Sequence, residues 1–250
     1  MKSVSKGTRQ ALMTVSMSAP RAEARSWVEP SERLRDVAIR VVRHTLIRGS
    51  RVYGLDSIPP IGGAVLAMNH FSAIDPPLVA SLVPRSVRFM MKSELERFPY
   101  GHALALLGGF PVKRGAGDRV AFTHACNLVR DGHLVGMCVE GTRQPTKHVA
   151  AHIHRGAIAV AVRAGVPIIP CGIASFEWSV RRQGCCLVIG PQLRFVRSEG
   201  RGKRYELEAT LLRREMCLAL AQAQDALRRG FLGTVENESD GSLVVPFPRP

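Results

Sequence analysis

From Val52 onward the chain alternates short apolar runs with segments of helical periodicity, and this alternation limits the possible folds more than any other feature. The run GAVLAMN (63–69) is apolar at consecutive positions, as is typical of a strand buried on both faces of a parallel sheet. Similar runs stand at 86–91, 110–114, 134–140, 166–173 and 185–190. Helical patterns occur at 76–83, 99–109, 118–132, 155–165 and 204–229. The sequence therefore predicts an α/β domain with a largely parallel or mixed sheet flanked by helices.

Composition divides the chain into four parts. Residues 1–30 are polar and rich in Ser and Arg, so we expect them to be disordered. Residues 31–49 form a predicted amphipathic helix, residues 50–230 a folded domain and residues 231–250 a loose tail. With 46% hydrophobic residues in a chain of 250, one domain can bury a sizeable core.

The predicted helix at 31–49 has two distinct faces, with Ser31 as a suitable N-cap and Gly49 as a suitable residue to end it. One face carries, at helical spacing, Leu34, Val37, Ala38, Val41, Val42, Thr45 and Leu46. The other face carries Arg33, Arg35, Arg40, Arg43 and Arg48. Such a helix either packs on the domain with its basic face in solvent or lies on an anionic lipid surface.

The net charge is +15, from 35 basic and 20 acidic residues, and it predicts an anionic partner such as nucleic acid, a membrane surface or a phosphorylated substrate. The sequence has no zinc-finger spacing, no aromatic-rich RNA-binding motif and only 6% aromatic residues, so we expect no nucleic-acid partner. No unbroken apolar stretch reaches the roughly 18 residues of a transmembrane helix. We therefore expect no segment to span a bilayer.

The cysteines lack the CxxC spacing of a zinc or redox site, and we see no secretory leader. Most of them lie inside apolar runs, at Cys126, Cys138, Cys171, Cys185, Cys186 and Cys217. We therefore expect reduced, buried thiols in a cytosolic protein, and no metal site.

The stretch NHFSAIDPP (69–77) places a histidine where a buried strand gives way to a loop. Open α/β sheets put ligand-binding residues at such strand ends. Taken singly, His70 fits a hydrogen-bonded core residue, and Asp75, before two prolines, fits a helix N-cap. Taken together, the short loop between them can fold Asp75 back onto one imidazole nitrogen and leave the other nitrogen basic. The pair therefore predicts a general base with an orienting carboxylate, acting on a substrate hydroxyl.

Basic residues follow two other predicted strands. A glycine turn after the strand at 134–140 would direct Arg143 towards the same sheet edge as His70, and Arg114, with Lys113 beside it, ends the strand at 110–114. An arginine can bind a phosphate through two parallel hydrogen bonds, although a single arginine is usually an ordinary surface charge. Two arginines on the edge that carries His70 predict a phosphate site.

These blocks together resemble the glycerophospholipid acyltransferases, particularly the 1-acylglycerol-3-phosphate acyltransferases. NHFSAID is similar to the NH-x4-D block of that family. The family's next three blocks have similar counterparts in this chain, in the same order: GGFPVKR (108–114), VEGTR (139–143) and VPIIPCGI (166–173). Val139 stands where the family commonly has proline. The resemblance covers roughly residues 52–191, and four blocks in order are far more specific than one short pattern.

The resemblance implies the family's α/β fold and its reaction. His70 would deprotonate the sn-2 hydroxyl of a lysophosphatidic acid-like acceptor, Asp75 would stabilise the imidazolium, and the alkoxide would attack an acyl thioester to give phosphatidic acid. The resemblance assigns substrate binding to Asn69, Lys113, Arg114, Glu140, Gly141, Thr142 and Arg143. Because a carboxylate repels a phosphate, Glu140 could instead bond the turn's own N–H groups or hold an arginine in place.

The expected partners are a lysophospholipid acceptor, acyl-CoA or acyl-carrier protein as acyl donor, and an anionic membrane surface. No cofactor beyond the donor is expected. We expect the chain to be cytoplasmic and peripheral on the inner face of the membrane. Three alternatives stay open, namely another lysolipid acceptor such as a lyso-ornithine lipid or a glycolipid, a lipid-binding protein without catalysis, and a basic nucleic-acid-binding protein.

Overall fold

A computed structural model of the chain describes residues 31–46, 50–97, 101–113, 118–144, 146, 148–175, 185–196 and 205–232. The expected disorder of residues 1–30, the ending of the first helix at Gly49, and most of the expected tail lie outside these residues. Arg114 lies outside them as well.

The described residues build one mixed sheet in the order β1-β7-β6-β2-β5-β3-β4. Its strands are β1 (Arg51–Tyr53), β2 (Ala64–Met68), β3 (Val87–Lys92), β4 (Gly109–Val112), β5 (Leu134–Cys138), β6 (Ile168–Ser175) and β7 (Cys185–Ile189). Every neighbouring pair is parallel except β6 and β7. The predicted fold class is thereby confirmed. The strand β1 was not predicted, because three residues are too few to show a periodic pattern.

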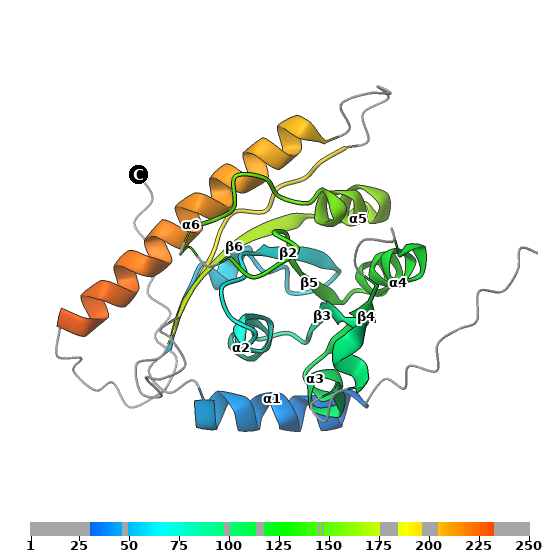
Figure 1. Cartoon of the computed structure of the whole chain (residues 1–250), viewed down its shortest axis with the longest axis horizontal. Coiled ribbons are helices and arrows are strands. Elements are labelled where there is room, and N and C mark those ends of the chain that lie inside the picture. Colours follow the sequence, from blue (N-terminus) through cyan, green and yellow to red (C-terminus); the bar gives the residue numbers. More distant parts are fainter. Residues whose placement is uncertain are drawn as a thin grey trace, which may run out of the picture.

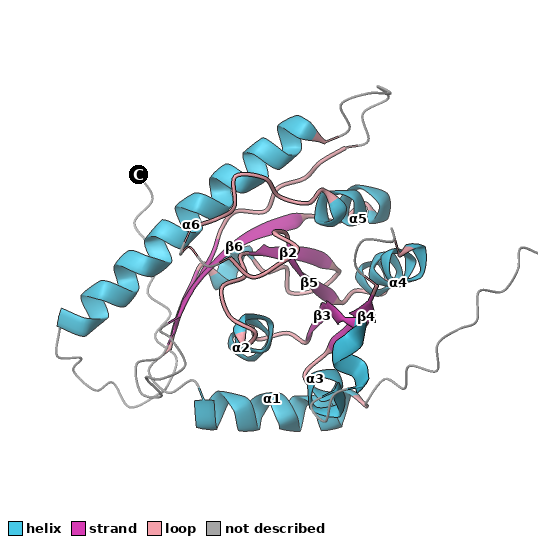
Figure 2. Cartoon of the chain, viewed as in Figure 1, coloured by secondary structure: helices cyan, strands magenta, loops and turns pink. Residues whose placement is uncertain are grey.

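Helices cover both faces of the sheet (Figures 1 and 2). They are α1 (Glu32–Leu46), α2 (Asp75–Leu82), α3 (Gly101–Leu106), α4 (Arg119–Arg130), α5 (Gly156–Ala164) and α6 (Glu206–Leu232). Short 3₁₀ turns lie at η1 (Leu55–Ser57) and η2 (Ser93–Arg97). Side chains of α4, α5 and α6 share one core with the sheet, and α2 shares a second core on the opposite face. α1 packs against α2 and α3. The strand β2 lies in the centre and is completely buried.

Local signals fix the ends of several helices. The Asp118 carboxylate accepts hydrogen bonds from the N–H groups of Val120 (3.1 Å) and Ala121 (3.0 Å), which caps α4. Its other oxygen accepts from the Lys113 N–H at 2.9 Å, so the cap also joins α4 to the end of β4. Gly165 ends α5 in the left-handed conformation, with φ of 72°.

The buried face of α1 differs from the predicted one. Arg35, which we placed on the solvated basic face, is completely buried, whereas Leu34, Val37 and Val41 are 52%, 56% and 56% exposed. The helix therefore packs through the side that holds Arg35 and the half-buried Ile39, about one residue around the helix from the apolar line. The long aliphatic stem of an arginine can contribute to such packing. The apolar line of Leu34, Val37 and Val41, here called the α1 stripe, is left on the surface.

All six cysteines lie in the described residues and are thiols, not disulfides. Four of them are buried, as expected, and Cys138 and Cys217 are half-buried. Burial raises the pKa of Cys171 to about 12 and that of Cys185 to about 11. These two thiols therefore stay protonated and unreactive near neutral pH.

Gly172 on β6 allows α6 to pack directly against the sheet. A Cβ atom at this position would lie 2.2 Å from the backbone nitrogen of Leu220 and 2.3 Å from the carbonyl carbon of Ala219. We expect Gly172→Ala to lower the free energy of unfolding by about 1–3 kcal/mol, since overpacking must push a helix off the sheet. Urea denaturation measures this change. Gly156→Ala is the control, because a Cβ there meets only a methionine methyl at 3.8 Å, and equal losses in both variants would contradict the role of close packing.

Candidate active site

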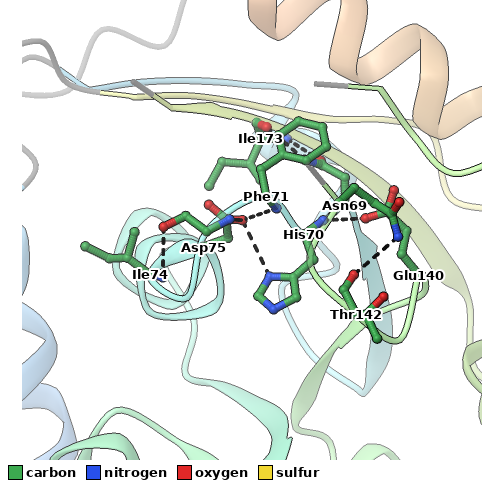
Figure 3. A network of polar contacts seen from close by, with 10 residues as sticks. Asn69, His70, Phe71, Ile74, Asp75, Glu140, Thr142 and Ile173 are labelled. Carbon is green, nitrogen blue, oxygen red and sulfur yellow. Dashed lines mark hydrogen bonds and ion pairs between the residues drawn. The ribbon is translucent and has the colours of Figure 1, made fainter. Parts of the chain in front are cut away.

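The candidate site lies where the central strands β2 and β5 end. β2 pairs in parallel with β5 on one side and β6 on the other, with Met68 opposite Cys138 and Cys171. The carboxyl ends of β2 and β5 therefore meet at one edge of the sheet, while β6 continues to Ser175, and the residues that follow Met68 and Cys138 come together there (Figure 3). This is the edge where parallel α/β sheets bind ligands.

Asn69 continues the pairing of β2 with β6 through its side chain. Its amide nitrogen donates to the Ile173 carbonyl oxygen at 3.0 Å, and its amide oxygen accepts from the Ile173 N–H at 2.8 Å. The residue is completely buried. Asn69, predicted to bind substrate, thus uses both polar atoms on the backbone of β6 and fixes the point at which the next residue leaves the sheet.

His70 and Asp75 face one another, as the short loop predicts. The His70 Nδ1 atom lies 3.5 Å from Asp75 Oδ2, and the two side chains are 11% and 1% exposed. This distance is an ion-pair contact longer than a hydrogen bond, and catalytic contacts of this kind commonly shorten when substrate binds. Figure 3 shows the opposite nitrogen of the ring turned away from Asp75. The pair can therefore stabilise an imidazolium while Nε2 handles a proton.

Asp75 is held in place by the loop and does not cap its own helix. Its Oδ2 atom accepts hydrogen bonds from the N–H groups of Phe71 (2.7 Å) and Ser72 (2.6 Å). The N-terminus of α2 has no side-chain cap. The simple N-cap interpretation of Asp75 is therefore wrong, and the carboxylate instead ties the loop that carries His70.

The Glu140 carboxylate is buried and bonds to two backbone groups. Oε2 accepts from the His70 N–H at 2.7 Å, and Oε1 accepts from the Ala150 N–H at 2.8 Å. Burial raises the pKa of the Glu140 carboxyl above its ordinary value, and the two hydrogen bonds oppose that rise. Glu140 thus bonds backbone N–H groups, as one alternative predicted, although these groups belong to two other loops and not to its own turn.

Gly141 makes the turn that follows β5. Its φ of 68° is in the left-handed region, and a Cβ there would lie 2.6 Å from the imidazole of His154. Beyond the turn, Thr142 and Arg143 are exposed. The exposed Arg143 thus follows β5, the strand next to the one that leads to His70.

Lys113 is farther from His70 than Arg143 is. It is exposed and follows β4, three strands from β2 in the sheet order, or about 14 Å at ordinary strand spacing. The structure therefore brings together the residues that follow β2 and β5 and leaves Lys113 towards the edge of the sheet.

Val139, where the family commonly has proline, adds a hydrogen bond at the site. Its N–H donates to the Met68 carbonyl oxygen at 3.2 Å, and its own carbonyl accepts from the His154 N–H at 2.6 Å. A proline at this position could not donate the first of these bonds.

The residues that join the loops were not predicted from the sequence. The Gln144 N–H donates to the His70 carbonyl oxygen at 2.8 Å. Ala150 also accepts from Arg213 Nε on α6 at 2.8 Å, through its carbonyl oxygen. Backbone contacts of this kind leave no signature in residue type, so no sequence signal could have found them.

The described residues include no group of three or more His, Cys, Asp and Glu side chains that could hold a metal ion. What the site offers is an imidazole with a carboxylate partner, and an exposed arginine after a neighbouring strand. This set can remove a proton from a hydroxyl and attract an anionic group beside it.

Comparisons with known proteins agree with this chemistry. A family model described as Acyltransferase matches residues 49–174. The chain is 27% identical, over 161 residues, to the 1-acyl-sn-glycerol-3-phosphate acyltransferase of Bacillus subtilis (strain 168), covering 62% of this chain and 79% of that protein. The crystal structure of the 1-acyl-sn-glycerophosphate (LPA) acyltransferase PlsC from Thermotoga maritima has the same fold, with a TM-score of 0.56, 20% identity and 78% of each chain covered. Because the model match spans half of the chain and contains both His70 and Asp75, this chain belongs to the Acyltransferase family.

Proposed function

We propose that the chain transfers a fatty acyl group from a thioester to the sn-2 hydroxyl of lysophosphatidic acid, giving phosphatidic acid. The observation that carries this proposal is the His70–Asp75 pair at the carboxyl edge of the sheet, beside the turn that presents Arg143. The similarity to the Bacillus subtilis acyltransferase supports the same acceptor.

In the proposed reaction His70 is the general base. Nε2 takes the proton of the acceptor hydroxyl while the oxygen attacks the thioester carbonyl carbon. Asp75, 3.5 Å from Nδ1, stabilises the imidazolium that forms. The tetrahedral intermediate then expels the thiolate, which takes the proton back from Nε2. The thioester belongs to acyl-CoA or acyl-carrier protein, and no cofactor enters the balance.

The proposed phosphate ligand is Arg143. It is exposed, and its turn is held one strand away from His70. A guanidinium can bind a phosphate with two charge-assisted hydrogen bonds. We also propose that the positive charges of Lys113 and Arg114 attract the phosphate from a longer distance. Gly141 and Thr142 form the turn that leads to Arg143.

The α1 stripe supports attachment to a membrane surface. None of the described helices combines the length and apolarity that a membrane span needs. Leu34, Val37 and Val41 are all more than half exposed, and the exposed Arg33 and Arg40 lie on the same helix. A helix with an exposed apolar line and flanking arginines fits the interface of an anionic bilayer. We infer that α1 holds the enzyme on the inner face of the membrane, where its acceptor lies.

The central experiment compares wild type with His70→Ala. Purified protein in mixed micelles receives lysophosphatidic acid and a long-chain acyl-CoA or acyl-carrier protein, and mass spectrometry measures phosphatidic acid. We expect kcat to fall at least about 100-fold, because general-base catalysis contributes about 10²–10⁴-fold. Wild-type rates in the variant would contradict the assigned role of His70, and a wild type inactive with every donor and lysolipid would favour a lipid-binding protein.

Arg143→Ala tests the acceptor class. With lysophosphatidic acid we expect the KM for the acceptor to rise roughly tenfold to hundredfold, since hydrogen bonds to a charged group contribute about 1.5–3 kcal/mol. With a lysolipid that has no phosphate the variant should match wild type. Arg228→Ala, at an exposed arginine near the end of α6, is the control. An unchanged KM for lysophosphatidic acid would remove Arg143 from the phosphate site.

The α1 stripe can be tested by vesicle sedimentation. The triple variant Leu34→Ser, Val37→Ser and Val41→Ser should bind anionic vesicles at least about tenfold more weakly, since burying each side chain contributes about 1.5 kcal/mol or more. Its stability should change little, because all three side chains are exposed.

The matched control for the α1 stripe replaces the exposed leucines of α6, which are Leu207, Leu211 and Leu218. α6 and α1 lie on opposite sides of the sheet in Figure 1, so a flat bilayer cannot contact both helices at once. Loss of vesicle binding in the α6 variant, with binding kept in the α1 variant, would assign the docking surface to α6.

A further inference from the structure

The backbone of His70 is held at both of its polar groups by the segment that follows β5. Its N–H donates to Glu140 Oε2 at 2.7 Å, and its carbonyl oxygen accepts from the Gln144 N–H at 2.8 Å. The position of the imidazole therefore depends on where the 140–144 segment lies. That segment also carries Arg143, so one set of bonds sets the distance between the proposed base and the proposed phosphate ligand.

Ala150 joins this segment to the body of the protein. Its N–H donates to Glu140 Oε1 at 2.8 Å, and its carbonyl oxygen accepts from Arg213 Nε at 2.8 Å. Ala150 therefore contacts two ionisable side chains. Glu140, at the end of β5, accepts from its N–H group, and Arg213, on α6, donates to its carbonyl oxygen. α6 packs on β6 and β7, so Arg213 is attached to a rigid element.

Glu140 and Arg213 both bond the backbone of Ala150, and these contacts are here called the Ala150 joint. The Glu140 residue is 5% exposed, and each carboxylate oxygen already accepts a backbone N–H. A buried carboxylate with both oxygens engaged is poorly placed to contact an acceptor, and its charge would repel a phosphate. Arg213 is half-buried and makes its hydrogen bond to a neutral carbonyl.

We propose that Glu140 and Arg213 are positioning residues for acyl transfer, which hold the segment after β5 against the His70 loop through Ala150, and that Glu140 does not contact the acceptor. This inference rests on the proposed function. Misplacing a reacting group by about 1 Å can lower the rate about 100-fold, so a remote pair of bonds can affect kcat.

Glu140→Gln tests the first half of the proposal. Gln keeps the size of Glu but turns one acceptor into an NH₂ group, which faces a backbone N–H and loses that bond. We expect kcat to fall about 100-fold, with the KM for lysophosphatidic acid within about twofold of wild type. A raised KM with kcat unchanged, as expected for Arg143→Ala, would overturn the proposal.

Arg213→Met tests the second half against two matched variants. Arg214→Met removes an exposed arginine from the next position of the same helix and should match wild type. Arg213→Met should lower kcat about tenfold without changing KM, and Arg213→Lys should restore part of the rate, because an ammonium can still donate to the Ala150 carbonyl. No rescue by Lys, or an equal loss in Arg214→Met, would overturn the role of Arg213.

The double variant Glu140→Gln, Arg213→Met shows whether both residues act through one joint. Their effects on kcat should be clearly less than multiplicative, because either change alone already breaks the chain of bonds that runs from His70 through Glu140 and Ala150 to Arg213. Multiplicative effects would contradict a shared joint, and thermal melting of each variant shows whether a lost rate reflects unfolding. Failure of the proposed function looks different, since wild type itself would then make no phosphatidic acid.

Discussion

A buried strand that stops pairing leaves N–H and C=O groups that need partners, and the site depends on how the end of β2 meets this requirement. Asn69 supplies the next rung to β6 through its side chain. Glu140 and Gln144 bond the two backbone groups of His70, and Asp75 bonds the N–H groups of Phe71 and Ser72. The block NHFSAID therefore stabilises the local fold, because the polar side chains of Asn69 and Asp75 bond the backbone around His70.

The sequence predicts the sheet well because buried parallel strands need consecutive apolar residues, and β2, β5 and β6 are such runs. It predicts the facing of His70 and Asp75 because a short loop leaves few other arrangements. The N-terminal helix is less predictable. Periodicity identifies α1 as amphipathic, but it does not say which side packs on α2, and a buried Arg35 reverses the simple expectation that arginines face solvent.

Electrostatic repulsion between Glu140 and a phosphate predicts more about this residue than the motif does. A carboxylate beside a phosphate is unfavourable, and in the structure each oxygen of that carboxylate accepts a hydrogen bond from a backbone N–H group. Its partner Ala150 could not be predicted, since an alanine has no polar side chain to suggest a contact. Arg213 likewise looks like any other arginine of α6, and only the path of the loop brings it to the Ala150 carbonyl.

Attachment through the α1 stripe, as proposed above, would change how the enzyme's rate is described. α1 packs against α2, whose first residue is Asp75, so a bilayer under α1 would lie on the side of the sheet that holds Asp75. An enzyme that stays on a surface meets its acceptor by diffusion in two dimensions. Its rate then follows the mole fraction of lysolipid in that surface and not the amount per volume of solution. Inert lipid added at constant total acceptor would slow it, and one landing on a vesicle would allow many turnovers before departure.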